Sequence, residues 1–224
     1  EKDLQLYPQK CILKMGKQKL KLLLPRVKSN MIKEKLKSRE IGIEKNQDIS
    51  EKLAKKSRVL LALGANLNSK FGNRIETLEI AQTYLINNGI KIIKKSCYYE
   101  SLSYPNTNDP KFINCVLSIT TDLGPIKLMD VIINIEKKIG RVRNKKNEPR
   151  VCDIDIIDYK NEIIKMYYNN SNLIIPHEKI QDRNFVLIPL KEIEPLWIHP
   201  ETNLNIETLI NNFNINNINS ITKI

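Results

Sequence analysis

The 224-residue chain has few glycines, few aromatic residues and no long apolar run. Its 7 glycines form neither a Gly-x-x-x-x-Gly-Lys-Ser/Thr loop nor a Gly-x-Gly-x-x-Gly turn, which excludes a P-loop and a Rossmann-type nucleotide site. No apolar stretch approaches the roughly 20 residues that span a bilayer, and the first residues lack the pattern of a secretory signal. We therefore expect a soluble protein with no membrane partner, cytoplasmic or, as the alternative, in an organelle.

Cysteines are also scarce, and none are closely spaced. The chain has four, and their positions exclude zinc sites of the Cys-x-x-Cys type: Cys11, Cys97, Cys115 and Cys152. A chain of this length needs no disulfide bonds to hold a core together. We expect reduced thiols in a cytosol-like compartment.

Acidic residues are too few to balance the basic ones, and the formal net charge is +12. A basic chain of this kind points first to nucleic acid or an anionic membrane. However, residues 1–58 carry 17 Lys and Arg against 7 Asp and Glu, whereas residues 59–224 carry 20 against 18. The positive charge therefore belongs to the N-terminal quarter, and the rest of the chain is nearly neutral.

The basic segment, residues 1–57, mixes lysine-rich runs with short apolar pieces that offer no face apolar enough to bury. We interpret it as an extension or linker, with a nucleic-acid contact or an organelle address as the alternatives. Residues 58–215 form the expected catalytic domain, which we expect to be monomeric and not to bind nucleic acid.

From Arg58 onward the hydrophobic pattern becomes regular. Apolar runs predict strands at 59–63, 90–102, 112–123 and 151–159. Helical spacing predicts one helix between Asn73 and Asn88 and a second between Pro125 and Gly140. Polar turns are expected at 105–110 and 166–172. The order strand, helix, strand, strand, helix, strand predicts an α+β fold, a ferredoxin-like βαββαβ sandwich with C-terminal additions.

Two acids on the last of these strands form the strongest local signal. Asp153 and Asp155 alternate with apolar neighbours, so both project from one face, about 7 Å apart along the strand. Such a pair repels itself unless a cation neutralises it, and it suits Mg²⁺ that also binds phosphate oxygens. The alternative is a solvent-facing edge strand that carries two acids by coincidence.

Basic and aromatic residues near these acids favour a metal and polyphosphate site. Guanidinium groups match phosphate oxygens, and four arginines accompany the acids, three shortly before them and one in a later loop: Arg141, Arg143, Arg150 and Arg183. His177 offers a phosphate donor or a structural hydrogen bond. On the preceding strand, Phe112 and Asn114 share a face and suit a flat heteroaromatic ligand. The alternative, which these residues alone favour, is a packing role for Phe112 and a turn role for Asn114.

These residues occur in blocks whose order and spacing resemble one enzyme family. The blocks are Leu63-Gly64-Ala65-Asn66-Leu67, Tyr99-Glu100-Ser101, Phe112-Ile113-Asn114, Glu136, Gly140-Arg141-Val142-Arg143, Pro149-Arg150-x-x-Asp153-x-Asp155, Pro176-His177 and Arg183-x-Phe185-Val186-Leu187. The chain resembles 6-hydroxymethyl-7,8-dihydropterin pyrophosphokinase over roughly residues 58–209. The resemblance implies folate biosynthesis, in which ATP gives its diphosphate to the pterin and leaves as AMP.

The resemblance also implies a role for each matching residue. Two Mg²⁺ ions are expected on Asp153 and Asp155. The catalytic group is expected to be Arg143, Arg150, Asp153 and Asp155. ATP is expected to contact Glu136, Arg141, Arg143, His177 and Arg183. The pterin is expected to contact Ser101, Tyr104, Phe112, Asn114 and Phe185.

One departure from the family pattern bears on activity. The loop at 144–148 is shorter than usual and lacks the aromatic residue and the glycine that commonly precede Pro-Arg, which puts loop closure and turnover in question. The alternative function is therefore a non-catalytic or weakened module of a larger multifunctional folate-pathway protein. Fused or neighbouring enzymes of that pathway are the expected protein partners.

Overall fold

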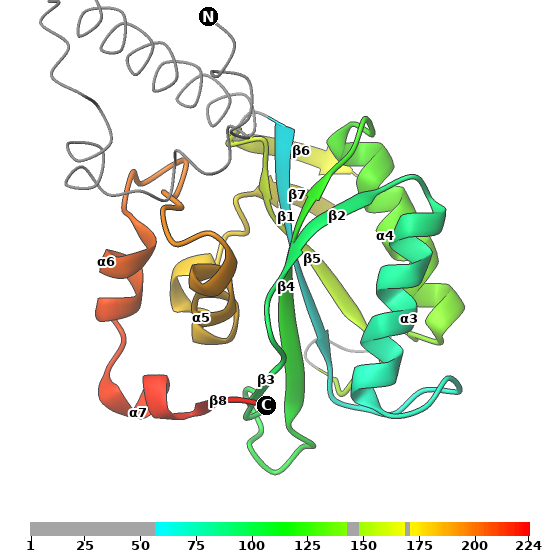
Figure 1. Ribbon diagram of the computed structural model, residues 1–224, viewed down its shortest axis with the longest axis horizontal. Coiled ribbons are helices and arrows are strands. Elements are labelled where there is room, and N and C mark those ends of the chain that lie inside the picture. The colour runs from blue at the N-terminus through cyan, green and yellow to red at the C-terminus, as the bar shows by residue number, and fades with distance from the viewer. Residues whose placement is uncertain (1–56, 143–147, 169–170) are drawn as a thin grey trace, which may run out of the picture. The chain divides into compact units, whose positions relative to one another are not determined.

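The computed structural model describes residues 57–142, 148–168 and 171–224 (Figure 1). These residues belong to a unit that runs from Glu51 to Ile224. Its first part contains, in order, β1 (Arg58–Ala65), α3 (Arg74–Asn87), β2 (Lys91–Lys95), β3 (Tyr99–Ser101), β4 (Phe112–Thr120), α4 (Pro125–Ile139) and β5 (Asp153–Tyr159). Its second part adds β6 (Ile164–Tyr168), β7 (Ser171–Ile175), the short 3-10 helix η2 (Ile180–Asp182), α5 (Asn184–Ile193), α6 (Ile206–Asn211), α7 (Ile215–Asn219) and β8 (Ile221–Lys223).

The main sheet is antiparallel and has the strand order β5-β1-β4-β3-β8. Strand β2 pairs with the other half of β4, so β2 and β3 together take the place of one long edge strand. Strands β6 and β7 form a separate hairpin. This topology, with α3 and α4 on one face, confirms the predicted α+β ferredoxin-like sandwich.

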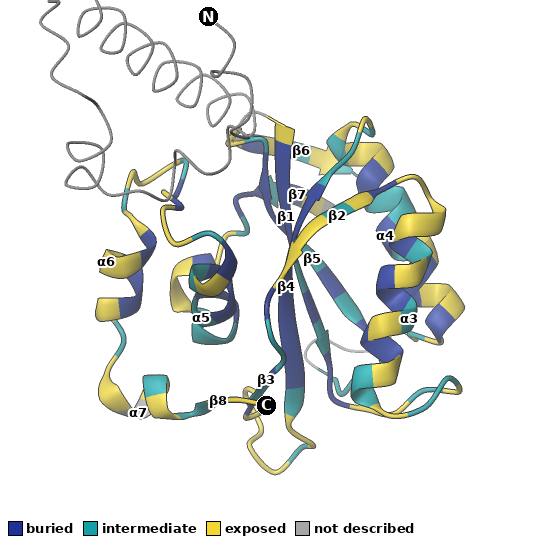
Figure 2. Ribbon diagram, in the orientation of Figure 1, coloured by how far each residue is buried: buried dark blue, intermediate teal, exposed yellow. Residues whose placement is uncertain are grey.

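Hydrophobic cores lie on both faces of the sheet, because the central strands are apolar on both sides. Val59, Leu61 and Leu63 of β1 pack with the buried sides of α3 and α4. Leu60 of β1 and Val116 of β4 pack instead with α5 and α6. The two helix pairs lie on opposite sides of the sheet in Figure 1, and Figure 2 shows the buried positions along β1 and β4 between them.

The helix boundaries follow the predicted capping residues. The Asn73 side chain accepts hydrogen bonds from the backbone N–H groups of Ile75 and Glu76, and Glu76 bonds back to the Asn73 backbone. At the end of α4, Gly140 has a φ of 116°, a left-handed conformation that favours glycine. None of the helices in the described ranges combines the length and apolarity needed to span a lipid bilayer.

The prediction of a single strand over 90–102 was wrong. The structure has two short strands there, because the ladder to β4 is interrupted at Ser96. The Ser96 hydroxyl oxygen accepts a hydrogen bond from the Val116 N–H, in place of a backbone carbonyl. This break lets β3 pair with the N-terminal part of β4, where the candidate site lies.

The prediction of a polar turn over 166–172 was also wrong. Most of this segment belongs to the hairpin of β6 and β7, whose register pairs Met166 with Leu173. Met166 and Leu173 pack on the core beside α4, so the hairpin contributes apolar contacts. The polar run at 169–172 resembles a turn in the sequence and shows no strand alternation.

Asp158 of β5 is fully buried and ties the C-terminal part to the sheet. Its carboxylate accepts hydrogen bonds from the Trp197 indole N–H at 2.8 Å and from the Asn161 N–H at 2.8 Å. Arg58 lies 3.5 Å from the same carboxylate and 3.0 Å from Glu194. A buried carboxylate requires such partners, so this acid has a structural explanation that the sequence pattern did not supply.

Candidate active site

The floor of the candidate site is a row of residues directly opposite one another on three adjacent strands. Gly64 of β1 pairs with Asn114 of β4 on one side and with Asp153 of β5 on the other. Two residues away along β1, Ala62 pairs with Asp155. Residues paired in this way share a face of the sheet, and here it is the face that α5 covers. The middle strand therefore contributes only small side chains between the amide and the acids.

The predicted acid pair is held by arginines in the described structure. Arg141 bonds to one oxygen of Asp153, and Arg150 lies 2.7 Å from the other. Arg183 lies 2.5 Å from Asp155. The side chains of the two acids are 23% and 32% exposed, so both remain accessible from solvent. The sequence prediction that these arginines accompany the acids is thus supported by direct contacts.

Glu136 lies behind this cluster and connects helix α4 to β5. One of its carboxylate oxygens accepts hydrogen bonds from the Ile154 N–H at 2.9 Å and from Arg141. Burial disfavours the charged guanidinium of Arg141, but the negative charges of Asp153 and Glu136 outweigh burial and raise the pKa of Arg141. Glu136 is 1% exposed. Its contact with a nucleotide stays a prediction.

His177 lies on the same side of the sheet as Asp155 and Arg183. Its Nδ1 atom accepts a hydrogen bond from the Lys179 N–H at 3.0 Å, so the neutral ring carries its proton on Nε2. Burial lowers the pKa of His177, against the opposing effect of the Asp155 charge. The neutral ring therefore has an Nε2–H that can donate to a phosphate oxygen.

The predicted pterin residues gather at the other end of the row. Asn114 is buried, and its amide nitrogen donates to the Ser101 hydroxyl oxygen at 2.9 Å. Its amide oxygen borders the space above Gly64, where an added Cβ would lie 3.3 Å away. The ring of Phe112 borders the same space at 3.6 Å. An amide and an aromatic ring thus lie beside the acid pair.

Both predicted aromatic residues also contact an arginine of the cluster. The guanidinium of Arg150 lies 5.6 Å from the Phe112 ring centre, and that of Arg183 lies 5.8 Å from the Phe185 ring centre. These distances fit cation–π contacts. The aromatic rings and the arginines predicted to bind phosphate are therefore adjacent, an arrangement that suits a ligand with a flat ring and a charged tail.

Of the remaining predicted site residues, one is exposed and one lies outside the described ranges. The Tyr104 side chain is 83% exposed, on the loop between β3 and β4, so its pterin contact stays a prediction. Arg143 lies outside the described residues, as do the loop positions 144–147.

The cysteines of the described ranges form no disulfide. Cys97, Cys115 and Cys152 are free thiols, and Cys11 lies outside the described residues. Burial raises the pKa of Cys152, next to the acid pair, so this thiol stays protonated.

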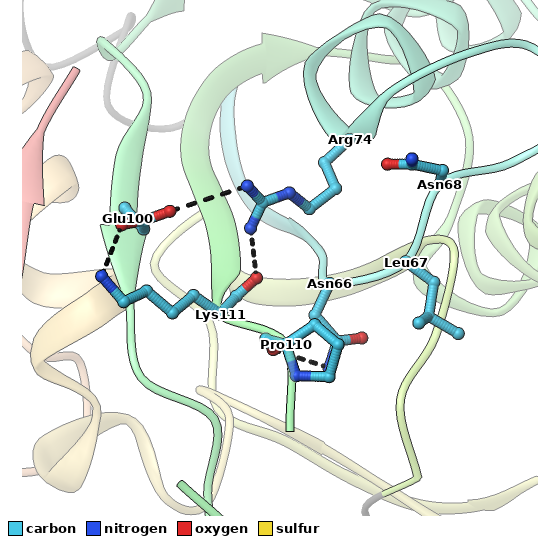
Figure 3. A pocket seen from close by; sticks show the side chains of 7 residues that line it. All are labelled: Asn66, Leu67, Asn68, Arg74, Glu100, Pro110 and Lys111. Carbon is cyan, nitrogen blue, oxygen red and sulfur yellow. Dashed lines mark hydrogen bonds and ion pairs between the residues drawn. The ribbon is translucent and has the colours of Figure 1, made fainter. Parts of the chain in front are cut away.

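One pocket is lined by none of the predicted site residues, although the turn after β1 borders it. It measures about 510 Å³ and is lined by Asn66, Leu67, Asn68, Arg74, Glu100, Pro110 and Lys111 (Figure 3). Glu100 alternates with Tyr99 and Ser101 along β3, so it faces away from Asn114. Its carboxylate is already paired with Lys111 at 2.9 Å and with Arg74 at 3.6 Å.

The donor set fits the expected magnesium ions. In the described ranges, no group of three or more His, Cys, Asp and Glu side chains could hold a metal. Two partly exposed carboxylates on one strand face remain. Mg²⁺ in proteins is commonly held by one or two carboxylates, with water and substrate phosphates as its other ligands. Asp153 and Asp155, surrounded by phosphate-matching arginines, meet that requirement.

A family model described as "7,8-dihydro-6-hydroxymethylpterin-pyrophosphokinase (HPPK)" matches residues 60–195, more than half of the chain. The chain belongs to this family. A relative from Methylorubrum extorquens named "2-amino-4-hydroxy-6-hydroxymethyldihydropteridine pyrophosphokinase" is 34% identical over 140 residues, which cover 62% of this chain and 84% of the relative. The expectation of a pyrophosphokinase of folate biosynthesis is confirmed at the level of the HPPK family.

Longer relatives contain an HPPK region as one part. "Folic acid synthesis protein FOL1" of Dictyostelium discoideum is 36% identical over 187 residues, which are 79% of this chain and 26% of that protein. A Plasmodium falciparum HPPK-DHPS crystal structure has a TM-score of 0.58 at 18% identity and covers 74% of this chain and 46% of that one. The second match supports the HPPK fold. The chain thus spans about a quarter of one such relative and about half of the other.

Proposed function

We propose that the chain transfers the diphosphate of ATP to 6-hydroxymethyl-7,8-dihydropterin. In this reaction the hydroxymethyl oxygen bonds to the β-phosphorus and loses its proton, while the bond from the β-phosphorus to the oxygen shared with the α-phosphorus breaks. The products are the pterin diphosphate and AMP. The observation that supports this proposal is the row of Asn114, Gly64 and Asp153, in which a buried amide lies beside the acid pair.

The pterin end supplies recognition and orientation. The Asn114 amide oxygen accepts from N–H groups on the edge of the ring, and its nitrogen is fixed by Ser101. The rings of Phe112 and Phe185 provide stacking surfaces for the flat pterin. Holding the hydroxymethyl group in line with the β-phosphorus lowers the entropic part of the barrier.

The acidic end binds the triphosphate. Asp153 and Asp155 would hold two Mg²⁺ ions, which neutralise phosphate charge when bound. The arginines that occupy these carboxylates in the structure then move to phosphate oxygens, where their charge stabilises the transferring group. His177 donates its Nε2–H to the triphosphate. The carboxylates and arginines therefore exchange partners when the nucleotide binds.

An AMP-release assay tests the proposal. The purified chain, supplied with ATP, Mg²⁺ and 6-hydroxymethyl-7,8-dihydropterin, is expected to release AMP in proportion to the pterin consumed. Asp155→Asn is expected to abolish turnover with an unchanged circular dichroism spectrum, because a neutral amide is a poor Mg²⁺ ligand. AMP release that does not rise above background in a folded wild-type chain would refute the proposed activity.

The second candidate is a non-catalytic or weakened module of a larger folate-pathway protein. The observation that favours it is the shortened loop at 144–148, together with relatives of which this chain covers only a quarter. Calorimetry separates the two candidates. Binding of an ATP analogue and pterin without turnover supports the module, and absence of pterin binding contradicts both.

A further inference from the structure

Asn66, in the turn after β1, connects the phosphate and pterin ends of the candidate site. Its side chain is 3% exposed although it ends in a polar amide. A buried amide at a loop position needs its hydrogen bonds satisfied, and each of its two polar atoms has a partner from a different loop. The pattern of those partners indicates what the residue does.

The oxygen of the amide holds the backbone of Arg150. The Arg150 N–H donates to the Asn66 Oδ1 atom at 2.6 Å. The Arg150 carbonyl oxygen accepts from the backbone N–H groups of Asn66 and Leu67, at 3.0 and 3.2 Å. Both polar backbone groups of Arg150 are therefore held by the turn after β1. A fixed backbone limits where the long arginine side chain can place its guanidinium, which here reaches Asp153 and the Phe112 ring.

The nitrogen of the same amide holds the loop between β3 and β4. It donates to the Ser103 hydroxyl oxygen at 3.3 Å and to the Pro110 carbonyl oxygen at 3.1 Å. Ser103 in turn donates to the Pro110 carbonyl oxygen at 2.5 Å. This loop begins just after Ser101 and ends just before Phe112, so its position bears directly on the predicted pterin residues.

We propose that Asn66 is a positioning residue that sets Arg150 for the phosphates and couples Arg150 to the pterin loop. The chemistry requires an amide, because only an amide of this size offers an acceptor on one atom and two donors on the other. This inference rests on the proposed function for its catalytic consequence. Its structural part, control of Arg150 by Asn66, is testable by nucleotide binding alone.

The test compares Asn66→Ala with Asn68→Ala, an exposed neighbour in the same turn that serves as the matched control. Calorimetry with a non-hydrolysable ATP analogue and Mg²⁺ gives nucleotide affinity, and turnover gives kcat and KM. Misplacement of a catalytic group by about 1 Å costs on the order of 100-fold. We expect Asn66→Ala to lose about 10- to 100-fold in kcat/KM and to bind the nucleotide more weakly, with Asn68→Ala within about twofold of wild type.

A double-mutant cycle with Arg150→Ala separates positioning from general stability. If Asn66 acts through Arg150, Asn66→Ala reduces nucleotide affinity much less when Arg150 is already alanine. Thermal unfolding of the same four proteins gives the stability effects, which are expected to add. Equal losses of affinity in the two backgrounds, or unchanged affinity in folded Asn66→Ala, would overturn the proposal.

Ser103→Ala keeps the inference testable if Asn66→Ala fails to fold. It removes a partner of the amide nitrogen and leaves the Arg150 contacts intact. We expect pterin binding to weaken more than nucleotide binding, whereas an equal loss for both ligands would contradict the separate roles of the two amide atoms. A wild-type chain that binds the nucleotide without turnover refutes the proposed function, yet the binding cycle still decides the proposal on Asn66.

Discussion

Replacing Arg183 by glutamine is expected to shift metal and nucleotide affinities in opposite directions. In the described structure the Arg183 guanidinium occupies Asp155 at 2.5 Å, so a divalent cation that binds alone has to displace it. ATP brings phosphate oxygens that give the arginine a new partner. Removing the guanidinium is therefore expected to strengthen the binding of the metal ion alone and to weaken the binding of the metal–nucleotide complex.

The magnitude follows from the exposure of the pair. Unit charges 4 Å apart interact by about 4 kcal/mol near a protein surface, and fully exposed pairs contribute about 1 kcal/mol or less. The side chains of Arg183 and Asp155 are 23% and 32% exposed, so we assign about 1–2 kcal/mol to the interaction between them. This corresponds to about 5- to 30-fold tighter binding of the free metal. Loss of a charged hydrogen bond to phosphate, about 1.5–3 kcal/mol, weakens nucleotide binding by about 10- to 150-fold.

The assay uses Mn²⁺ as the probe, because the electron paramagnetic resonance signal of the free ion reports binding directly. Titrations are run without nucleotide and with a non-hydrolysable ATP analogue. Lys191→Gln is the matched control. Lys191 lies in α5 and pairs with Glu207, so its replacement removes the same charge away from the acid pair. Equal or weaker Mn²⁺ binding by Arg183→Gln than by this control would refute the exchange of partners.

Three further predictions concern ligand shape and stability. Gly64→Ala is expected to weaken pterin binding on the order of tenfold, measured by calorimetry with nucleotide affinity as the control, because the added Cβ lies 3.3 Å from the Asn114 amide oxygen. Trp197→Phe leaves the buried Asp158 one donor short and is expected to lower the free energy of unfolding by about 1–3 kcal/mol in urea titrations; an unchanged midpoint would contradict the network. Burial lowers the pKa of His199, so its imidazole becomes protonated at a lower pH in the folded chain than in the unfolded chain. The free energy of unfolding is therefore expected to be constant with respect to this group above about pH 6.5 and to fall below that pH. The fall is expected to be less steep in His199→Gln.

The acid pair could be predicted from sequence because its pattern is local. Asp153 and Asp155 alternate with apolar residues on one strand, and that alternation alone assigns them to one face. The capping residues of α3 and α4 are equally local, and they place both helices correctly. The arginines, Phe112 and Asn114 were candidates from their residue types and positions. Family resemblance added a role for each of them and further residues such as Ser101 and Phe185.

The features that the sequence did not reveal depend on contacts between distant segments. Asn66 stands in a block that matches the family, but its role appears only in the structure, where the loops of Ser103 and Arg150 converge on it. Ser96 interrupts a strand because its hydroxyl meets Val116, 20 residues away. The three residues of β8 are too few to show any periodicity.

Strand β8 has a consequence for how the protein behaves in solution. It pairs with β3 along the side opposite β4, with Ser101 opposite Ile221 and Tyr99 opposite Lys223. Lys223 also contacts Glu192, which accepts a hydrogen bond from the Tyr99 hydroxyl. Without β8, the backbone groups of β3 would form an open edge onto which a strand from a second molecule could add. Removing residues 221–223 is therefore expected to produce concentration-dependent aggregation.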